Sequence, residues 1–128
     1  MKKEIPKLPD AELAVMQAIW RSDIPLSRAE IESALQSEKD WSTNTVLTLL
    51  VRLEKKGFIN RIKSGRAYLH EAIISEEQYL ENASSSLLNS LFRGNPVTFI
   101  AALHESENLT EQDIKELEDY LDSLKAGD

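Results

Sequence analysis

The chain has 128 residues, of which 41% are hydrophobic and 29% charged, with a formal net charge of −7 and no cysteine. This length allows one domain or two small ones with a buried core, and the lack of cysteine excludes disulfides and thiolate metal sites. No segment of the sequence has the length and apolarity of a membrane span or the pattern of a signal peptide, which predicts a cytoplasmic protein.

The first 40 residues predict two helices joined by a short extended segment. Asp10 can cap a helix that runs to about Arg21, because its carboxylate can accept a free backbone N–H. Pro25 then interrupts helical structure, since proline disfavours the helical conformation of the preceding residue. Ser27 and Glu30 fit a capping box that opens the second helix. The expected core residues are Leu13, Met16, Ala18, Ile19 and Trp20 in the first helix and Ile31, Ala34 and Leu35 in the second.

A third helix is predicted from Ser42 to Gly57, with the serine as its N-cap and the glycine closing it in a left-handed conformation. At about 100° per residue, its side chains divide into two faces. The apolar face carries Val46, Leu49, Leu50 and Leu53, extended by Leu47 and Val51. The polar face carries Asn44, Thr45, Thr48, Arg52, Lys55 and Lys56. Small hydrogen-bonding groups at the front and cations behind them suit a helix that enters a DNA major groove, although a solvated face has the same pattern.

A β-hairpin is predicted directly after this helix. Phe58 and Ile59 lead into a strand that turns at Ser64-Gly65, and Tyr68 lies on the return strand. Three helices followed by a two-stranded hairpin form a winged helix-turn-helix. We therefore assign residues 1–74 to a winged helix-turn-helix DNA-binding domain, in a fold class that is mainly α with a small β-hairpin wing.

Positive charge is concentrated on the third helix and the hairpin. Residues 1–74 hold 12 Lys and Arg against 10 Asp and Glu, whereas residues 75–128 hold 3 against 12. From Trp41 to Tyr68 there are six cations, and Glu54 is the single anion. Because salt screens charges beyond about 10 Å, this patch can bind phosphate although the whole chain is acidic.

We therefore expect sequence-specific binding of double-stranded DNA through the third helix and the wing. Asn44, Thr45 and Thr48 are expected to face base edges, and Ser42 caps the helix that presents them. The residues expected to face phosphates are Thr43, Arg52, Lys55, Arg61, Lys63 and Arg66. The alternative is a winged-helix protein interaction module that does not bind DNA, and the excess of cations favours DNA over it.

Residues 75–128 predict an all-α domain. Ser75 and Gln78 fit a second capping box, Gly94-Asn95-Pro96 ends the helix that follows, and a short apolar helix is expected over residues 97–103. Thr110 can cap the last helix. The apolar residues of that helix are spaced three, four and three apart, which is typical of helices that pack on partners.

We expect this second domain to form a homodimer. The predicted dimerisation residues are Leu80, Leu87, Leu88, Leu91, Ile100, Leu103, Ile114, Leu117, Leu121 and Leu124. One recognition helix reads too few bases to select a site in a genome, and a two-fold dimer doubles the contacts. The alternative is a monomer in which the apolar stripe packs against Leu13 and Ile19.

Short stretches along nearly the whole chain form a family pattern. They are Asp10–Leu13, Val15-Met16, Ile19-Trp20, Trp41–Val46, Thr48–Leu50, Arg52-Leu53, Lys55–Gly57, Gly65–Tyr68, Glu77 and Tyr79-Leu80. Through them the chain resembles the BlaI/MecI/CopY family of bacterial winged-helix repressors. The resemblance implies a homodimer that binds inverted-repeat operators and represses nearby genes, for β-lactam resistance in some members and for copper handling in others.

Two departures from the family pattern concern regulation. Copper-responsive members carry a C-terminal cysteine metal motif, so copper sensing by that chemistry is excluded for a chain without cysteine. Penicillinase-type members are inactivated by cleavage of an Asn-Phe bond in the tail, whereas the corresponding place here is near Ala102-Leu103. The resemblance therefore implies a sensor or protease that relieves repression, but it assigns no cleavage site, inducing signal or target gene.

The sequence contains no enzyme motif, and we expect no catalytic residue, cofactor or metal. The four glycines form no phosphate loop, and no Gly-x-Ser-x-Gly motif occurs. His70 and His104 lie far apart in the chain, and we interpret His70 as a wing or interface residue. Trp20 and Trp41 are interpreted as core anchors.

Overall fold

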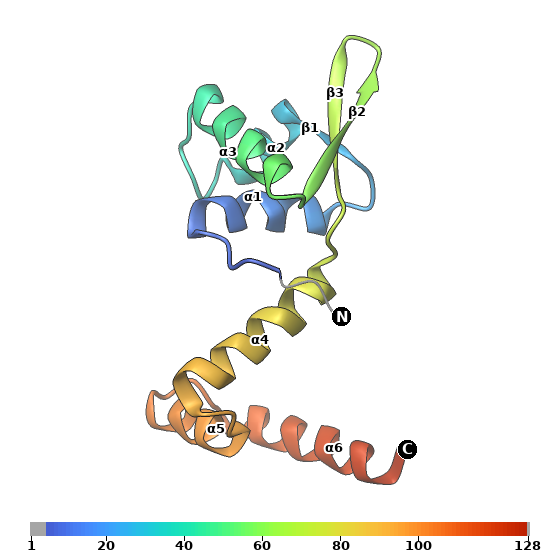
Figure 1. Ribbon diagram of the computed structural model, residues 1–128. Helices are drawn as coiled ribbons and strands as arrows, with labels where there is room; N and C mark the ends of the chain where they lie inside the picture. The colour runs from blue at the N-terminus through green and yellow to red at the C-terminus, as the bar shows by residue number, and fades with distance from the viewer. Residues whose placement is uncertain (1–4, 128) are drawn as a thin grey trace. The chain divides into compact units, whose positions relative to one another are not determined.

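A computed structural model describes residues 5–127 (Figure 1). Its elements are α1 (Asp10–Arg21), β1 (Leu26–Ser27), α2 (Arg28–Leu35), α3 (Thr43–Lys55), β2 (Ile59–Ser64), β3 (Ala67–Ala72), α4 (Glu76–Phe92), α5 (Pro96–Glu105) and α6 (Glu111–Gly127). The chain divides into two units, residues 1–83 and 84–128. The predicted fold class, mainly α with a small β wing, is confirmed.

Helix α1 begins with Pro9 as its N-cap, so the prediction that Asp10 caps this helix is wrong. The extended backbone of Pro9 places its carbonyl to accept the N–H of Leu13 at 2.9 Å, and Asp10 is already helical. The Asp10 carboxylate still lies in the first turn, where it complements the helix dipole. Helix α1 buries Ala14, Val15, Met16, Ala18 and Ile19, while Leu13 and Trp20 are partly buried against the same core.

Helices α2 and α3 form the helix-turn-helix, and both predicted caps are confirmed. Ser27 and Glu30 make the reciprocal bonds of a capping box at the start of α2. The Ser42 hydroxyl accepts the backbone N–H of Thr45 at 3.2 Å. Gly57 follows α3 with φ of +81°, the left-handed conformation that glycine adopts without strain.

The wing is a three-stranded antiparallel sheet in the order β1-β3-β2. The extended segment between α1 and α2 pairs with β3 as an edge strand, whereas the sequence predicted a two-stranded hairpin. Ser64 pairs with Ala67, so the turn residues are Gly65 and Arg66 rather than the predicted Ser64-Gly65. Gly65 has φ of +61°, as the first central position of a type II′ hairpin turn requires.

Tyr79, near the start of α4, belongs to the core of the first unit. Its hydroxyl accepts the backbone N–H of Leu8 at 2.9 Å. Its ring centroid lies 5.6 Å from that of Trp20 and 5.9 Å from that of Phe58. The first unit therefore includes the beginning of α4, beyond the domain boundary that the sequence predicted after residue 74.

The second unit contains the end of α4 together with α5 and α6. The Thr110 N–H donates to the Asp113 carboxylate, and the Asp113 N–H donates to the Thr110 hydroxyl, both at 3.0 Å. These reciprocal bonds confirm Thr110 as the cap of α6. Asn95 caps α5, which spans residues 96–105 and is longer than the predicted 97–103. Among residues 5–127, no helix has the length and apolar character needed to cross a membrane.

Candidate nucleic-acid interface

Helix α3 has one face in the core and the opposite face in solvent. The buried residues Val46, Leu49, Leu50 and Leu53 are at most 4% exposed. The exposed face carries Asn44, Thr45, Thr48, Arg52 and Lys55. Since the buried side chains fix the rotation of the helix about its axis, these polar groups are presented together. The predicted division into two faces is confirmed for these residues.

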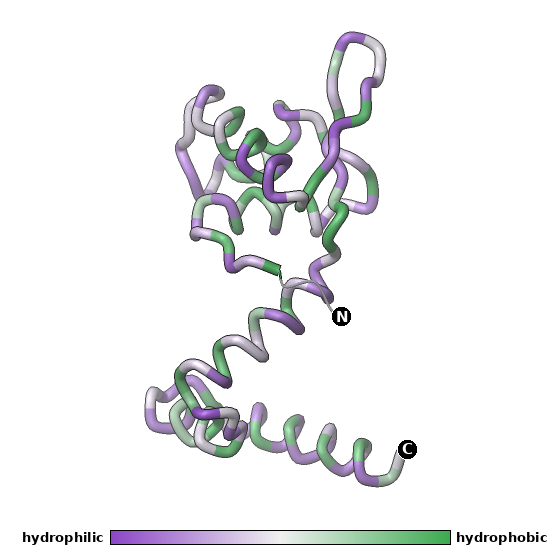
Figure 2. The backbone as a smooth tube through the Cα atoms, in the orientation of Figure 1, coloured by the Kyte–Doolittle hydropathy of each residue, from purple (hydrophilic) through white to green (hydrophobic). Residues whose placement is uncertain are grey.

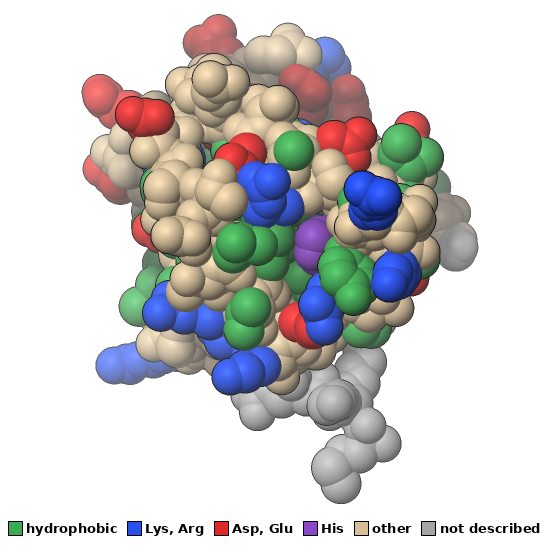
Figure 3. Space-filling view, turned by 90° about the horizontal axis from the view of Figure 1, so that it is seen from above, with side chains coloured by type: hydrophobic (Ala, Val, Ile, Leu, Met, Phe, Trp, Pro, Cys, Tyr) green, Lys and Arg blue, Asp and Glu red, His purple; other side chains and the backbone are tan. Residues whose placement is uncertain are grey.

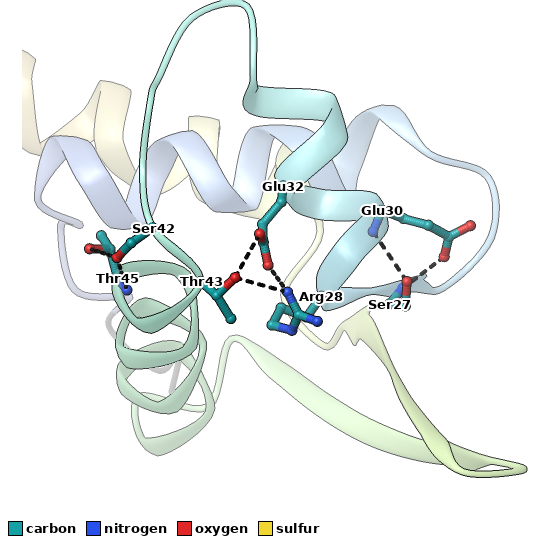
Figure 4. Close-up of polar contacts among 7 residues, drawn as sticks. All are labelled: Ser27, Arg28, Glu30, Glu32, Ser42, Thr43 and Thr45. Carbon is teal, nitrogen blue, oxygen red and sulfur yellow. Dashed lines mark hydrogen bonds and ion pairs between the residues drawn. The ribbon is translucent and has the colours of Figure 1, made fainter.

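The first turn of α3 is organised by hydrogen bonds among its own polar residues. The Ser42 and Thr45 hydroxyl oxygens lie 3.0 Å apart, close to the cap that Ser42 provides (Figure 4). The Thr48 hydroxyl donates to the backbone carbonyl of Asn44 at 2.9 Å. The side-chain amide of Asn44 has no hydrogen bond to any residue between 5 and 127, so it can offer both a donor and an acceptor to another molecule.

A cluster of Arg28, Glu32 and Thr43 links α2 to the start of α3 (Figure 4). Arg28 pairs with Glu32, and its guanidinium donates to the Thr43 hydroxyl at 3.4 Å. The Thr43 hydroxyl donates to the Glu32 carboxylate at 3.1 Å. The sequence assigned Thr43 to a phosphate contact, but its hydroxyl already donates to a carboxylate of the protein and therefore cannot donate to a phosphate at the same time. Arg28 was not predicted at this interface, because its place beside α3 depends on how the two helices pack.

Two of the six cations near α3 are held by ion pairs. The Lys56 ammonium lies 2.5 Å from the buried carboxylate of Glu12 and so ties the end of α3 to α1. Arg61 lies 2.8 Å from the Glu54 carboxylate on α3, and its guanidinium carbon is 4.8 Å from the centroid of the Tyr68 ring. Both cations hold elements of the first unit together, which makes them less available to phosphate.

The other four cations form an accessible positive surface. Arg52 and Lys55 on α3 and Lys63 and Arg66 on the wing are exposed, and none of them pairs with an acid in the part of the chain that the structure describes. Lys63 lies two residues after Arg61 on β2, so both side chains extend from the same face of the hairpin. That face is the one from which Arg61 reaches α3.

A cleft of about 620 Å³ separates α3 from the wing. Leu47 and Val51 line it and are 43% and 53% exposed, so the prediction that they extend the core face of α3 is wrong. The wing stands beside this flank of α3 without covering it. Figure 3 shows this face of the first unit, with hydrophobic side chains between groups of Lys and Arg.

His70 belongs to the wing, as interpreted from the sequence, but it is buried in the sheet and only 5% exposed. Its Nδ1 atom lies 3.0 Å from the carbonyl oxygen of Leu26 on the neighbouring strand. Trp20 is partly buried, and its indole N–H donates to the carbonyl of Ile74 at 3.0 Å. Among the described residues, no group of three His, Asp or Glu is arranged to hold a metal ion.

The predicted dimerisation residues are distributed over α4, α5 and α6. Those exposed to solvent are Leu80, Leu87, Leu91, Ile114, Leu121 and Leu124, while Leu88, Ile100, Leu103 and Leu117 are half-buried. Figure 2 shows hydrophobic and hydrophilic residues alternating along α6. Ile100, Ile114 and Leu117 line a shallow hollow of the second unit. Residues of α5 and α6 therefore line this hollow together, and the rest of the apolar surface is uncovered in the single chain.

Comparison with known proteins gives consistent matches. Residues 8–123 match the family model described as penicillinase repressor. The penicillinase repressor of Bacillus licheniformis is 35% identical over 123 residues, which cover 96% of this chain and 95% of that relative. The methicillin resistance regulatory protein MecI of Staphylococcus aureus strain N315 is 31% identical over 94% of this chain and 98% of its own length. The solution structure of monomeric Bacillus licheniformis BlaI in complex with the blaP half-operator is 40% identical, with a TM-score of 0.51 over 62% of this chain and 94% of that chain.

Proposed function

The chain belongs to the penicillinase repressor family of DNA-binding transcriptional repressors, and we propose that it represses transcription as a homodimer on an inverted-repeat operator. The complex of the similar BlaI chain with a half-operator supports operator DNA as the partner. One copy on half of an operator agrees with two copies on a whole two-fold site. We place this activity in the cytoplasm, where bacterial operator DNA lies.

The exposed polar face of α3 is the observation that carries this proposal. Asn44, Thr45 and Thr48 bring amide and hydroxyl groups of the kind that pair with base edges in a major groove. Arg52 and Lys55, which have no acidic partner among residues 5–127, bring cations to the same face, where they suit phosphates. We assign the first three residues to base reading and the last two to the DNA backbone.

The wing provides further backbone contacts in this proposal. Lys63 and Arg66 are assigned to phosphates because they are exposed and free of ion pairs within the described residues. Arg61 and Thr43 are reassigned from phosphate contacts to positioning residues, since Arg61 holds the wing to α3 and Thr43 holds α3 to α2. Ser42 acts through its cap on the first turn.

The uncovered apolar surface of the second unit supports the homodimer. Leu91 and Leu124 are 68% and 58% exposed, and Val97 is 73% exposed. Complete burial of one such side chain, compared with full exposure, stabilises a protein or an interface by roughly 1.5–3 kcal/mol. A second copy offers an identical surface that can cover these residues in a two-fold interface.

Release of repression completes the proposed function. We retain a sensor or protease as the partner that ends repression, as in the family to which this chain belongs. Ala102 and Leu103, where the sequence places the corresponding site, lie within α5. A protease acting there needs the helix to open first, because proteases cleave extended backbone.

The decisive experiment is a titration of the full chain against fluorescein-labelled promoter DNA from its own transcription unit at several salt concentrations. We expect a dimer to bind this DNA at least about 1000-fold more tightly than random DNA of the same length. Each phosphate neutralised should contribute about −0.9 to the slope of log K against log salt.

Equal affinity for promoter and random DNA would contradict the repressor function. Absence of any DNA binding by a folded chain would instead support the winged-helix protein interaction module. Circular dichroism on the same sample establishes that the chain is folded, so neither outcome can be attributed to denaturation.

A further inference from the structure

We propose that the cleft between α3 and the wing binds a small amphiphilic acid, namely an apolar ring or chain that carries one anionic group, and that this ligand competes with DNA. The volume of about 620 Å³ lies within the range of small-molecule sites. Binding to the cleft is independent of the proposed repressor function, whereas competition with DNA rests on it.

The floor of the cleft is apolar although it opens to solvent. Leu47, Val51 and Tyr68 are 43%, 53% and 46% exposed, and Leu50 and Ala67 complete the floor. Leu47 lies three residues after Asn44, and Val51 lies three residues after Thr48, so both border the exposed polar face of α3 on the side of the wing. A sugar-phosphate backbone placed here would lose water from its charged oxygens without gaining donors from the floor, so an apolar ligand fits better than DNA.

The rim of the cleft supplies positive charge. Arg28, Arg61 and Arg66 face a single acid, Glu54. Arg61 already neutralises Glu54 at 2.8 Å, and Arg28 pairs with Glu32 outside the cleft. Arg66 is left without an ion pair in the described part of the chain, so its planar guanidinium is available to a carboxylate or sulfonate.

The same arginine connects the cleft to DNA binding. Arg66 lies in the wing turn, where we assign it to a phosphate, and an anion in the cleft would engage it instead. A ligand seated on Leu47 and Val51 also lies beside Asn44 and Thr48, so it obstructs the approach of DNA to the exposed side of α3. Ligand and DNA should therefore weaken each other's binding by the same factor.

Naphthalene-2-sulfonate is a suitable probe because it combines an apolar bicycle with one anionic group. The full chain, labelled with ¹⁵N, is titrated with the probe without DNA, and amide shifts are followed. We expect saturable shifts at Leu47, Val51, Ala67 and Tyr68, with weaker binding of neutral 2-naphthol. Shifts that increase without saturation, or that concentrate on α4 to α6, would overturn the site.

Two variants with the same change of charge localise the binding. Val51→Glu puts a carboxylate on the cleft floor and should weaken probe binding at least about tenfold. Ile73→Glu makes the same change at a residue of the first unit that is 58% exposed and lies outside this cleft, so probe affinity should be unchanged. Equal effects of the two variants would show nonspecific adsorption and contradict the proposal.

Arg66→Gln tests the anionic group separately. It should weaken binding of the sulfonate several-fold and leave binding of 2-naphthol unchanged, because only the sulfonate needs a cation. An equal loss for both compounds would show that charge complementarity plays no part and would overturn the assignment of an acid.

A competition titration separates this inference from the proposed function. In the expected outcome the probe lowers the affinity for promoter DNA and Ile73→Glu behaves like the wild-type chain. If the probe saturates the cleft but the chain binds no promoter DNA, the ligand site stands and the repressor function fails. If promoter DNA binds while the probe does not, the repressor function stands and the ligand site fails.

Discussion

The two units of this chain differ in how much of their apolar side chains is exposed to solvent. In the first unit, Val15, Leu53 and Phe58 are completely buried. In the second unit, none of the described residues is buried, and Leu91 and Val97 are 68% and 73% exposed. The first unit thus has a core of its own, whereas the second unit exposes apolar surface of the kind that supports the homodimer we propose.

Charge follows the same division. Residues 1–74 hold 12 of the 15 Lys and Arg, six of them between Trp41 and Tyr68, whereas residues 75–128 hold 12 of the 22 Asp and Glu. An acidic second unit is repelled by DNA phosphates, which leaves its apolar surface free for another copy of the chain. In the proposed function, DNA binding therefore belongs to the first unit and association with a second copy belongs to the second unit.

The largest effect is expected from Leu121→Asp combined with Leu124→Asp. Both side chains are about half exposed in the single chain, so the change should spare its fold but place charges in the proposed dimer interface. We expect loss of the dimer and at least about a 100-fold loss of operator affinity. Analytical ultracentrifugation and DNA titration measure the two effects, with Glu116→Lys as the control on the exposed side of α6. A double variant that still sediments as a dimer would place the interface elsewhere.

A smaller effect, on stability, is expected from Lys56→Met. This change leaves the buried Glu12 carboxylate without its cation and should lower the free energy of unfolding by roughly 2 kcal/mol, below the range for fully buried pairs because water reaches Lys56. Urea denaturation followed by tryptophan fluorescence reports on the first unit, which contains both tryptophans. The neighbouring Lys55→Met is the matched control and should change stability by less than about 0.5 kcal/mol. Equal losses in the two variants would show that the Glu12 pair contributes nothing specific.

Arg52→Ala should weaken operator binding about tenfold without changing the dimer. The reason is the loss of one phosphate contact, so the slope of log K against log salt should also become less steep by about 0.9. Lys55→Met should have a similar effect, whereas Lys56→Met should leave the slope unchanged because its charge is already paired. An unchanged slope for Arg52→Ala would remove that residue from the DNA backbone contacts.

The smallest effect concerns pH at the start of α6. The backbone N–H of Thr110, followed by its hydroxyl, lowers the pKa of the Asp113 carboxyl below its usual range. A carboxyl whose pKa is lowered by folding stabilises the folded state above its unfolded pKa of about 3.9, and this contribution is lost as pH falls through the lower folded value. The protection of amides in the first turn of α6, measured relative to their intrinsic exchange rate at each pH, should therefore decrease below about pH 4. Asp113→Asn should remove this pH dependence, and its persistence in that variant would assign the effect to another group.

Local signals in the sequence were enough to locate the helices and most of their caps. Ser27, Ser42 and Thr110 were each identified from groups three residues apart, because a cap is a bond between near neighbours in the chain. The apolar period of α3 likewise determined its buried face. Asp10 was misassigned because the preceding proline carbonyl can start a helix without a side-chain cap.

Tertiary structure alone decided which polar groups near α3 are held by ion pairs or hydrogen bonds to distant residues of the protein. Lys55 and Lys56 are adjacent and chemically equal, yet only Lys56 meets Glu12, which lies 44 residues away in the chain. Thr43 and Arg61 appeared in the sequence as phosphate contacts and are bound by Glu32 and Glu54 in the folded chain.

The cleft between α3 and the wing is likewise a result of tertiary packing. Leu47 and Val51 were counted with the core face because they are apolar, although Val51 lies three residues after Thr48 and is exposed like it; that the wing forms the opposite wall of a cleft beside them depends on packing. A helical repeat determines the direction in which each side chain leaves the axis, and it contains no information about which distant element occupies that direction. The sequence by itself therefore determined the fold class and the buried face of α3, and packing between distant segments decided which residues of that helix remain available for the proposed contacts with DNA and ligand.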